Sequence, residues 1–497
     1  MFCISKCIKN EINQRNVIAI YTKMGELLFF SCRTKIKNMY NVNFQQPNHL
    51  HFIGIGGISM SGLAEILLQE GFRITGSDRD ASEIVEKLRE LGAEIMIPQA
   101  AENIRPGIDC VIYTAAIHPD NPEFQAVKEA GIPMLTRAEL LGQIMEHYHN
   151  SIAVAGTHGK TTTTSMLTDV LLAADADPTV SVGGMLSSIG GNIRVGKSDV
   201  FVAEACEYTN SFLSLKPRFS VITTVEEDHM DFFHNIEEIQ ESFRAFAKNT
   251  AEDGAVIING EIRDYCRIIE DLPCKVITYG LQGDYDYTAE EIAYDENGCA
   301  GFVPVCFGNR LTPVQLSVPG QHNVSNALAV IAVARELGVT DESTRKGLSS
   351  FTGAGRRFEW KGEFSGVAVV DDYAHHPTEI RATIAAAGKV PHSRLIVAFQ
   401  PHTYTRTQAF LQDFAKALSG ADLVVLADIY AAREQNTIGI SSEDLMEKIK
   451  EYGTECYYFS SFSEIESFLQ KKVMNRDLLI TMGAGDIYKV GDHLLKK

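Results

Sequence analysis

A glycine-rich segment with one lysine and several threonines, residues 155–163, could bind the phosphates of a nucleotide. It reads Ala-Gly-Thr-His-Gly-Lys-Thr-Thr-Thr and lies between an apolar run at 151–154 and a helical stretch at 165–172. A strand, a glycine turn and a helix N-terminus present several backbone N–H groups to one small space, which favours an anion. Lys160 would neutralise the outer phosphates, and the Thr161 hydroxyl would hold Mg²⁺.

The spacing of this segment differs from the common phosphate loop, because fewer residues separate its two glycines. A chance Gly-Lys-Thr in a surface loop is therefore the alternative interpretation. The strand before the segment and the helix after it favour a nucleotide triphosphate site.

Two residues at expected strand ends could hold a metal ion beside this segment. Glu204 follows the apolar run 199–203, and His229 comes shortly after the run 219–225. The carboxyl ends of parallel strands share one edge with a phosphate loop. A carboxylate there is a natural Mg²⁺ ligand, and a histidine can complete a second site. Each residue could instead cap its strand, but two on one edge favour a metal site.

A second glycine turn lies near the start of the chain, at residues 54–57. A strand at 49–53 precedes it, and a helix at about 62–70 and a strand at 72–78 follow. This βαβ pattern suits a pyrophosphate, and Asp78 lies where an acidic residue usually meets a ribose. Because Ser59 replaces the third glycine of the fingerprint, a dinucleotide cofactor is only one interpretation.

Three more residues in the middle of the chain could contact a nucleotide. Asn326 precedes an alanine-rich helix at 327–337 and could pair with a purine edge, although asparagine is common at helix starts. Arg356 and Arg357 follow glycines that mark the last linker, and could reach a transferring phosphoryl group. Solvated surface arginines are the alternative.

The pattern after residue 351 is again βα. Strands are expected at 367–370, 395–399, 423–427 and 478–481, with helices at 378–387 and 408–418. Polar residues fill the loops 371–379 and 400–406, and a tight turn follows at 483–486. Such loops at the carboxyl edge of a parallel sheet indicate a binding face.

Composition limits the functional class. The chain has 497 residues, enough for about three domains, and its net charge is −19 with a pI near 5.2. This acidity argues against nucleic acid or an anionic membrane as partner. The ten cysteines include no Cys-x-x-Cys pair, so neither a zinc site nor a disulfide framework is indicated and a cytoplasmic protein is expected. No apolar run is long enough to span a bilayer.

The first 48 residues differ from the rest. They carry seven Lys and Arg against two Asp and Glu. A basic regulatory arm is one interpretation. We favour a poorly ordered extension, dispensable up to residue 38, with a native start at Met39.

Five motifs taken together resemble the Mur ligases. They are Gly-Ile-Gly-Gly with Met-Ser-Gly (54–62), Gly-Thr-His-Gly-Lys-Thr-Thr (156–162), Glu-Asp-His-Met-Asp (227–231), Gly-x-His-Asn-Val-x-Asn-Ala (320–327) and Asp-Asp-Tyr-Ala-His-His-Pro-Thr-Glu (371–379). They occur in the family's order over about residues 49–497. The resemblance implies an α/β protein of three domains: a Rossmann-like UDP-binding domain (49–150), a central P-loop-type ATPase (151–350) and a Rossmann-like amino-acid domain (351–497).

The resemblance also implies an activity. Within the family, the expected reaction is ATP-dependent joining of L-alanine to the lactyl carboxylate of UDP-N-acetylmuramic acid through an acyl phosphate, in peptidoglycan precursor synthesis. ATP and Mg²⁺ would be the cofactors, and the protein would be a monomer or homodimer. A sister ligase that attaches a preformed peptide to the same sugar is the alternative, and a nucleotide-dependent oxidoreductase a remote one. Glycine or L-serine in place of L-alanine stays open.

The resemblance assigns site residues by position. It implies catalytic roles for Lys160, His376, Arg356 and Arg357. The other implied sets are ATP binding by Gly156, Thr157, His158, Gly159, Lys160, Thr161, Thr162 and Asn326; UDP-sugar binding by Gly54, Gly56, Gly57, Ser61 and Asp78; amino-acid binding by Tyr373, His375, His376 and Arg406; and metal binding by Thr161, Glu204 and His229.

This sequence departs from the family's pattern at three places. Thr224 stands where an asparagine is frequent, and Thr403 where many members have an arginine, which leaves Arg406 for the alanine carboxylate. Pro98-Gln99 replaces a frequent Gly-His pair, so the uracil contacts are not assigned.

Overall fold

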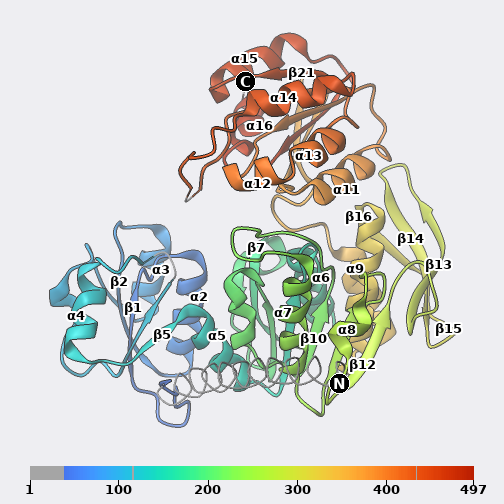
Figure 1. The fold of residues 1–497 in the computed structure, drawn as a ribbon. Coiled ribbons are helices and arrows are strands. Elements are labelled where there is room, and N and C mark those ends of the chain that lie inside the picture. Colours follow the sequence, from blue (N-terminus) through green and yellow to red (C-terminus); the bar gives the residue numbers. More distant parts are fainter. Residues whose placement is uncertain (1–38, 115–116, 433, 497) are drawn as a thin grey trace, which may run out of the picture. The chain divides into compact units, whose positions relative to one another are not determined.

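The computed structural model describes residues 39–114, 117–432 and 434–496, and the expected extension at 1–38 lies outside the described residues. The chain divides into two compact units between Leu140 and Leu141. The strands of the described residues form three separate sheets, each with helices packed against it (Figure 1). This confirms the predicted α/β class with three sheet-containing regions.

The first unit is built on a five-stranded parallel sheet with the order β3-β2-β1-β4-β5. Leu50, Phe52 and Ile53 of β1 are fully buried, as expected for a parallel strand covered on both faces. The order reverses between β1 and β4, so the loop after β1 lies at a switch point, where open α/β sheets bind ligands. The elements are β1 His49–Ile53, α2 Ile58–Gln69, β2 Arg73–Ser77, α3 Glu83–Glu90, β3 Glu94–Met96, β4 Cys110–Tyr113, α4 Pro122–Ala130, β5 Met134–Thr136 and α5 Arg137–Glu146.

Residues 39–48 pack beside the start of β2. The ring of Phe44 meets the ring of Phe72 edge-on, with centroids 5.5 Å apart. The Arg73 N–H donates to the carbonyl of Asn48 at 3.1 Å. Residues 39–48, the part of the expected extension that the structure describes, therefore pack on the first unit.

The central sheet of the second unit carries the phosphate segment. Its eleven strands have the order β15-β14-β13-β12-β11-β10-β6-β9-β7-β8, with β16 beside β14. Neighbours from β13 through β7 pair in parallel. The strands are β6 Asn150–Ala155, β7 Thr179–Leu186, β8 Gly191–Arg194, β9 Val200–Glu204, β10 Phe219–Ile222, β11 Ala255–Asn259, β12 Lys275–Tyr279, β13 Tyr287–Tyr294, β14 Cys299–Cys306, β15 Asn309–Arg310 and β16 Val314–Pro319. The helices are α6 Lys160–Ala173, α7 Ile236–Lys248, α8 Tyr265–Ile269, α9 Gln321–Glu336 and α10 Asp341–Ser350.

Helix α6, which starts in the phosphate segment, is buried among α9, α10 and the sheet. Its Leu167 and Val170 belong to the same apolar core as Val324 of α9 and Leu348 of α10. Gly347 lies where α10 touches α6, and a Cβ at this position would be 2.4 Å from the Cα of Val170. The close approach of the two helices therefore requires glycine.

Replacing Gly347 with alanine should lower the free energy of unfolding by about 1–3 kcal/mol, the usual cost of overpacking a core. Urea unfolding measures it. Gly388→Ala is the matched control, because Gly388 also has a helical φ of −62° and its nearest atoms would be 3.5 Å from a Cβ. Equal stabilities of the two variants would contradict the packing argument.

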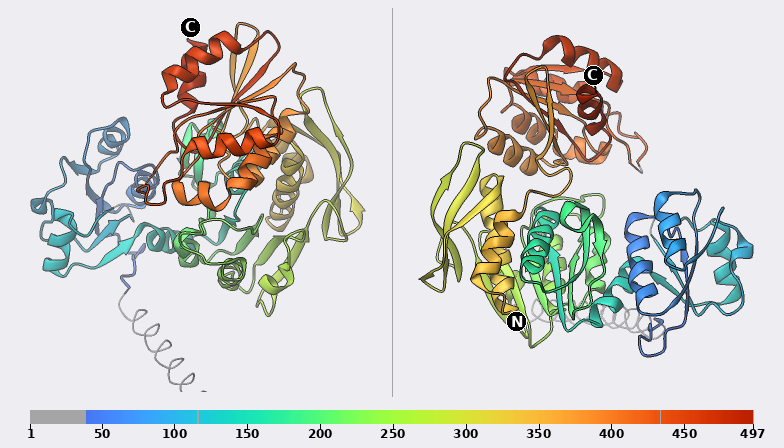
Figure 2. Two further views of the ribbon diagram at one scale, coloured as in Figure 1. Left: turned by 45° about the horizontal axis from the view of Figure 1, so that its top comes forward. Right: turned by 180° about the vertical axis from the view of Figure 1, so that it is seen from behind.

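The last sheet has six strands in the order β17-β18-β22-β19-β20-β21, and only β17 is antiparallel to its neighbour. Residues of β18 alternate between its faces: Val370 packs with α11, α13 and α14, and Val369 with α15 and α16. Helices therefore cover both faces (Figure 2). The elements are β17 Glu359–Phe364, β18 Val367–Asp372, α11 Pro377–Ala387, β19 Leu395–Phe399, α12 Tyr404–Ala409, α13 Leu411–Leu418, β20 Leu423–Leu426, α14 Ser442–Glu451, β21 Glu455–Tyr458, α15 Phe462–Lys472, β22 Leu478–Met482 and α16 Tyr488–Leu495.

Several expected boundaries were wrong in the same way, because three helices begin earlier than expected. Each starts directly after a glycine of its motif, namely Gly57, Gly159 and Gly320. The polar residues that follow were assigned to loops, but they form the first helical turns. Other corrections are that β10 ends at Ile222 instead of residue 225, that the helix expected at 408–418 is two helices, and that β3 and β5 were missed.

Among the described residues, no helix combines the length and the apolar content needed to cross a bilayer.

Candidate active site

Strand β6 leads into the phosphate segment at the carboxyl edge of the central sheet. Gly156 has a φ of 144° and Gly159 a φ of 84°, which side-chain-bearing residues rarely adopt. A Cβ on Gly156 would lie 2.0 Å from the hydroxyl oxygen of Thr223. Both backbone angle and space therefore require glycine at this turn.

Thr224, two residues after the end of β10, fixes the same turn through hydrogen bonds. The Thr157 N–H donates to the carbonyl of Thr224 at 2.9 Å, and the His158 N–H donates to the Thr224 hydroxyl at 2.7 Å. Thr224, one of the departures from the family's pattern, thus holds the phosphate segment in place.

Lys160 is the first residue of α6, and its ammonium is enclosed by acceptors. It donates to both carboxylate oxygens of Glu207, at 3.1 and 2.8 Å, and to the carbonyl of Thr157 at 3.1 Å. Burial favours the neutral amine, but Glu207 outweighs it and holds the pKa of Lys160 above its ordinary value. Lys160 is therefore a fixed cation at the helix N-terminus.

The three predicted metal ligands lie around this cation. The Thr161 hydroxyl donates to Glu204 Oε2 at 2.9 Å, and the Gly183 N–H donates to the same oxygen at 2.8 Å. His229 Nε2 lies 3.6 Å from Oε1 of Glu207, the partner of Lys160. A hydroxyl and a carboxylate are oxygen donors that suit Mg²⁺, so the residues present fit that ion.

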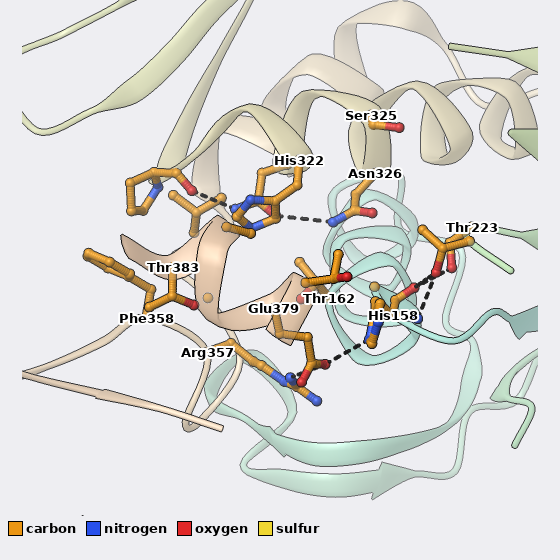
Figure 3. Close-up of a pocket in the computed structure, with 18 of the residues that line it drawn as sticks. His158, Thr162, Thr223, His322, Ser325, Asn326, Arg357, Phe358, Glu379 and Thr383 are labelled. Carbon is orange, nitrogen blue, oxygen red and sulfur yellow. Dashed lines mark hydrogen bonds and ion pairs between the residues drawn. The ribbon is translucent and has the colours of Figure 1, made fainter. Parts of the chain in front are cut away.

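A cavity of about 290 Å³ opens beside the phosphate segment (Figure 3). Leu281, Val318 and Phe351 contribute apolar surface, and Asn326 contributes a polar group. Asn326 lies in the second turn of α9, where its amide donates to Asn323 Oδ1 at 3.2 Å. An apolar cavity with a few polar groups suits a flat heterocycle.

The two adjacent arginines have different environments. Arg356 donates to Asp371 at 2.8 Å and to the carbonyls of Gly483 and Gly485 at 2.7 and 3.0 Å. Arg357 instead lines the cavity, 3.9 Å from Oε1 of Glu379. Of the two, Arg357 faces the space beside the phosphate segment.

Arg406 is ion-paired within the second unit. Its Nε and Nη2 donate to Asp228 Oδ1 at 3.1 and 2.7 Å, and the side chains are only 8% and 7% exposed. Arg406 holds the pKa of Asp228 far below its ordinary value, although burial alone would raise it. This pair connects α12 to the segment that follows β10.

The other predicted amino-acid residues lie at the start of α11. His375 Nδ1 is 3.0 Å from the carbonyl of Tyr373, and its ring meets the ring of His402 edge-on. His376 is the N-cap of α11 and accepts from the Thr378 N–H at 3.3 Å. Tyr373 lies under Arg357, 5.1 Å from ring centre to guanidinium carbon.

In the first unit, the predicted UDP-sugar residues surround the turn after β1. The Gly56 N–H donates to Asp78 Oδ2 at 2.8 Å, and a Cβ on Gly56 would be 2.9 Å from that oxygen. Gly57 caps α2, whose Ser61 hydroxyl donates to the carbonyl of Ile58. Gly54 has a φ of 81°, with Gln99 among its nearest side chains.

Sequence reasoning missed three acidic residues as site partners: Glu207, Asp228 and Glu379. Glu379 Oε1 lies 3.1 Å from Nδ1 of His158, which is a residue of the phosphate segment. Asp228 and Glu379 belong to segments that the sequence did single out, and Glu207 lies three residues after Glu204, so nearness in sequence to predicted site residues was the available signal. Their partners, however, come from distant parts of the chain.

Family models match three consecutive stretches. They are "Mur ligase family, catalytic domain" at 49–149, "Mur ligase middle domain" at 154–334 and "Mur ligase, glutamate ligase domain" at 356–485. The chain belongs to the Mur ligase family.

Individual Mur ligases are similar over nearly the whole chain. The UDP-N-acetylmuramate–L-alanine ligase of Agathobacter rectalis is 60% identical over 459 residues, covering 92% of this chain and 100% of the relative. A crystal structure of the UDP-N-acetylmuramate–alanine ligase of Thermotoga maritima has a TM-score of 0.74 at 30% identity, covering 90% of this chain and 98% of that one. A murein peptide ligase of Psychrobacter arcticus shares the fold, with a TM-score of 0.65 at 24% identity over 90% and 98% of the two chains.

Two partly buried histidines of this Mur ligase give a pH-dependent stability. Burial lowers the pKa of His375 to about 3 and of His402 to about 4, whereas an unfolded histidine titrates near 6.5. The unfolded state thus binds more protons in this window, and stability falls as the pH decreases from about 6.5 to 4. Burial raises the pKa of Asp372 to about 6, which offsets part of this loss.

His375→Gln should therefore flatten the dependence of the unfolding free energy on pH by about 1.4 kcal/mol per pH unit in this window. Urea unfolding at a series of pH values measures the slope. His234→Gln, at a side chain 83% exposed, is the control. The same slope in His375→Gln and the unmodified chain would contradict the assignment.

Proposed function

We propose that this chain joins L-alanine to the lactyl carboxylate of UDP-N-acetylmuramate, with ATP cleaved to ADP and phosphate, in peptidoglycan precursor synthesis. The observation that carries the proposal is 60% identity over the full length of a relative with that name. The fixed cation at the phosphate segment, close to oxygen ligands and an apolar cavity, supports it.

The first step is attack of a lactyl carboxylate oxygen on the γ-phosphorus of ATP. The bond from this phosphorus to the ADP oxygen breaks, and an acyl phosphate forms. Because both reactants are anions, the site must neutralise them. Lys160 and the first N–H groups of α6, which have no partner within the helix, would do so at the phosphates, in an environment where partial burial strengthens each charge.

Thr161 and Glu204 would hold one Mg²⁺, and His229 a second. The ions would supply positive charge to the phosphate oxygens. Thr161 and Glu204 already lie within hydrogen-bond distance, so little movement is required of the side chains.

ATP would place its purine in the cavity beside the phosphate segment, against Leu281, Val318 and Phe351. The Asn326 amide offers a donor and an acceptor to the purine edge. Arg357, at the rim between Glu379 and Tyr373, would approach the transferred phosphoryl group.

The second step is attack of the alanine amine on the acyl carbon, after which phosphate leaves and the nitrogen loses a proton. Arg406 would bind the alanine carboxylate, with Tyr373 and His375 beside it. Asp228 already accepts from two of the guanidinium donors. The alanine carboxylate would therefore either share the guanidinium with Asp228 or displace Asp228 from it. His376, whose pKa burial lowers, would be a neutral proton acceptor or would position the amine.

In the first unit, the turn at Gly54, Gly56 and Gly57 would bind the pyrophosphate of the UDP sugar. Its glycines allow close backbone approach, and Ser61 and Asp78 border it. The domain bounds, a monomer or homodimer, and a cytoplasmic location stay predictions.

The substrates that the purified chain requires distinguish this proposal from its two alternatives, a sister ligase and an oxidoreductase. A sister ligase would require a preformed peptide, and an oxidoreductase would change the absorbance of NADH. The purified chain should release phosphate from ATP only with UDP-N-acetylmuramate and L-alanine together, and mass spectrometry should show the alanyl product. Phosphate release with a peptide but not with alanine would replace this proposal by the sister ligase. Glycine and L-serine in parallel reactions would define amino-acid preference.

A further inference from the structure

Three side chains from separate segments of the second unit converge on one small space. They are His158 of the phosphate segment, Glu226 after β10, and His376 at the start of α11. Their nearest ligand atoms all lie within 4.8 Å of one another. The His158 and His376 ring centroids are 4.9 Å apart, and His158 Nε2 is 3.8 Å from Glu226 Oε2.

Both imidazoles leave a nitrogen without a hydrogen-bond partner in this space. Nε2 of His158 and Nε2 of His376 are buried and unpaired, and His376 is only 5% exposed. Burying a polar atom without a partner is unfavourable, so such atoms usually mark a bound water or ion. Here the unpaired Nε2 of His158 lies near Oε2 of Glu226, and the unpaired Nε2 of His376 belongs to the ring beside it.

Neighbouring groups orient two of these three side chains. Glu379 Oε1 lies 3.1 Å from His158 Nδ1, which keeps the proton on Nδ1 and directs the Nε2 lone pair into the space. The Thr378 hydroxyl donates to Glu226 Oε2 at 2.7 Å.

The separations are larger than those of a formed tetrahedral metal centre. Ligand atoms around Zn²⁺ lie about 3.3 Å apart, whereas His158 Nε2 and Glu226 Oε2 are 3.8 Å apart and the three ligand atoms lie within 4.8 Å of one another. A bound ion would therefore draw the three side chains together. Coordination by His376 Nε2 would move its proton to Nδ1 and release the long bond from Thr378 N–H. Helix α11 would keep its other cap, because Glu379 also accepts from the N–H groups of His375 and His376. An open cavity of about 440 Å³ lined by Glu226 and His376 gives access.

We propose that His158, Glu226 and His376 form a binding site for a borderline divalent metal, Zn²⁺, Co²⁺ or Ni²⁺, which shares no residue with the proposed Mg²⁺ ligands. Two imidazoles and one carboxylate suit these ions better than Mg²⁺, which prefers oxygen alone. The bound ion would tie α11 to the phosphate segment, and so would inhibit any reaction that needs these two elements to separate.

Titration of the full chain with Co²⁺, without substrates and with excess Mg²⁺ to occupy the oxygen-rich site, tests the proposal directly. The visible ligand-field absorption of four- or five-coordinate Co²⁺ should appear and saturate with one ion per chain. Glu226→Gln, which keeps the side-chain size, and His376→Ala should each weaken binding by more than about 10-fold. Zn²⁺ should raise the melting temperature of the unmodified chain but not of Glu226→Gln.

Two control variants locate the ion. Glu204→Gln alters the proposed Mg²⁺ site, and His234→Ala removes an exposed histidine paired with Glu238. Both should bind Co²⁺ like the unmodified chain. No saturable absorption, or unchanged binding in folded Glu226→Gln and His376→Ala, would overturn the proposal. Because no substrate is present, failure here is independent of the proposed reaction.

Discussion

Lys160→Ala should lower the rate of product formation by at least about 10²–10³-fold, the usual cost of losing one electrostatic contact to a developing charge. The lysine is a largely enclosed cation at the N-terminus of α6, and no other lysine or arginine donates to the carbonyls of the phosphate segment within the described residues. Steady-state phosphate release with ATP, UDP-N-acetylmuramate and L-alanine measures the effect.

A control variant must separate the loss of the Lys160 charge from the effect of leaving Glu207 unpaired. Removing Lys160 leaves a carboxylate that is 3% exposed without its partner, and breaking a buried pair in this way costs about 3–5 kcal/mol. The double variant Lys160→Ala, Glu207→Gln removes that charge and should regain most of the melting temperature without regaining activity. Normal turnover in a folded Lys160→Ala protein would contradict the role of Lys160.

Arg406→Ala should raise the KM for L-alanine by roughly 10- to 150-fold. A hydrogen bond to a charged group contributes about 1.5–3 kcal/mol, which corresponds to this range. If Arg406 binds only the amino acid, acyl-phosphate formation from ATP and the UDP sugar should survive. Borohydride trapping of the acyl phosphate and titration of alanine report the two half-reactions separately.

The ion pair with Asp228 makes a second variant necessary. Asp228→Asn removes the pair's negative charge but keeps the guanidinium, so it should leave the KM for alanine unchanged or lower it. An unchanged KM in Arg406→Ala, together with loss of acyl-phosphate formation, would place Arg406 at the phosphates. Similar losses in both variants would mean that the pair serves structure and not alanine.

Local patterns in the sequence were sufficient to predict the phosphate segment and part of the strands, including β6, β9 and β10 around that segment, but strands such as β3 and β5 were missed. The strand at 49–53 and the one at 395–399 were predicted to the residue, because buried parallel strands are short apolar runs with polar ends. The starts of three helices were not predicted, because glycine, serine, threonine and asparagine favour loops. In the structure, α2, α6 and α9 begin directly after Gly57, Gly159 and Gly320.

Partners distant in sequence could not be predicted. Nothing in the sequence distinguishes Arg356 from Arg357, yet one binds Asp371 and two carbonyls while the other lines the cavity. Likewise the pairing of Asp228 with Arg406, 178 residues apart, depends on how the last sheet packs in the second unit. The roles of the site residues in binding and catalysis stay predictions.

Transfer of an oxygen atom from the sugar to phosphate tests the central claim most directly. UDP-N-acetylmuramate labelled with ¹⁸O in its lactyl carboxylate is incubated with ATP, L-alanine and the full chain, and the released phosphate is analysed by mass spectrometry. Carboxylate attack on ATP followed by amine attack on the acyl carbon leaves one labelled oxygen in each phosphate. Unlabelled phosphate released together with the alanyl product would contradict an acyl-phosphate route.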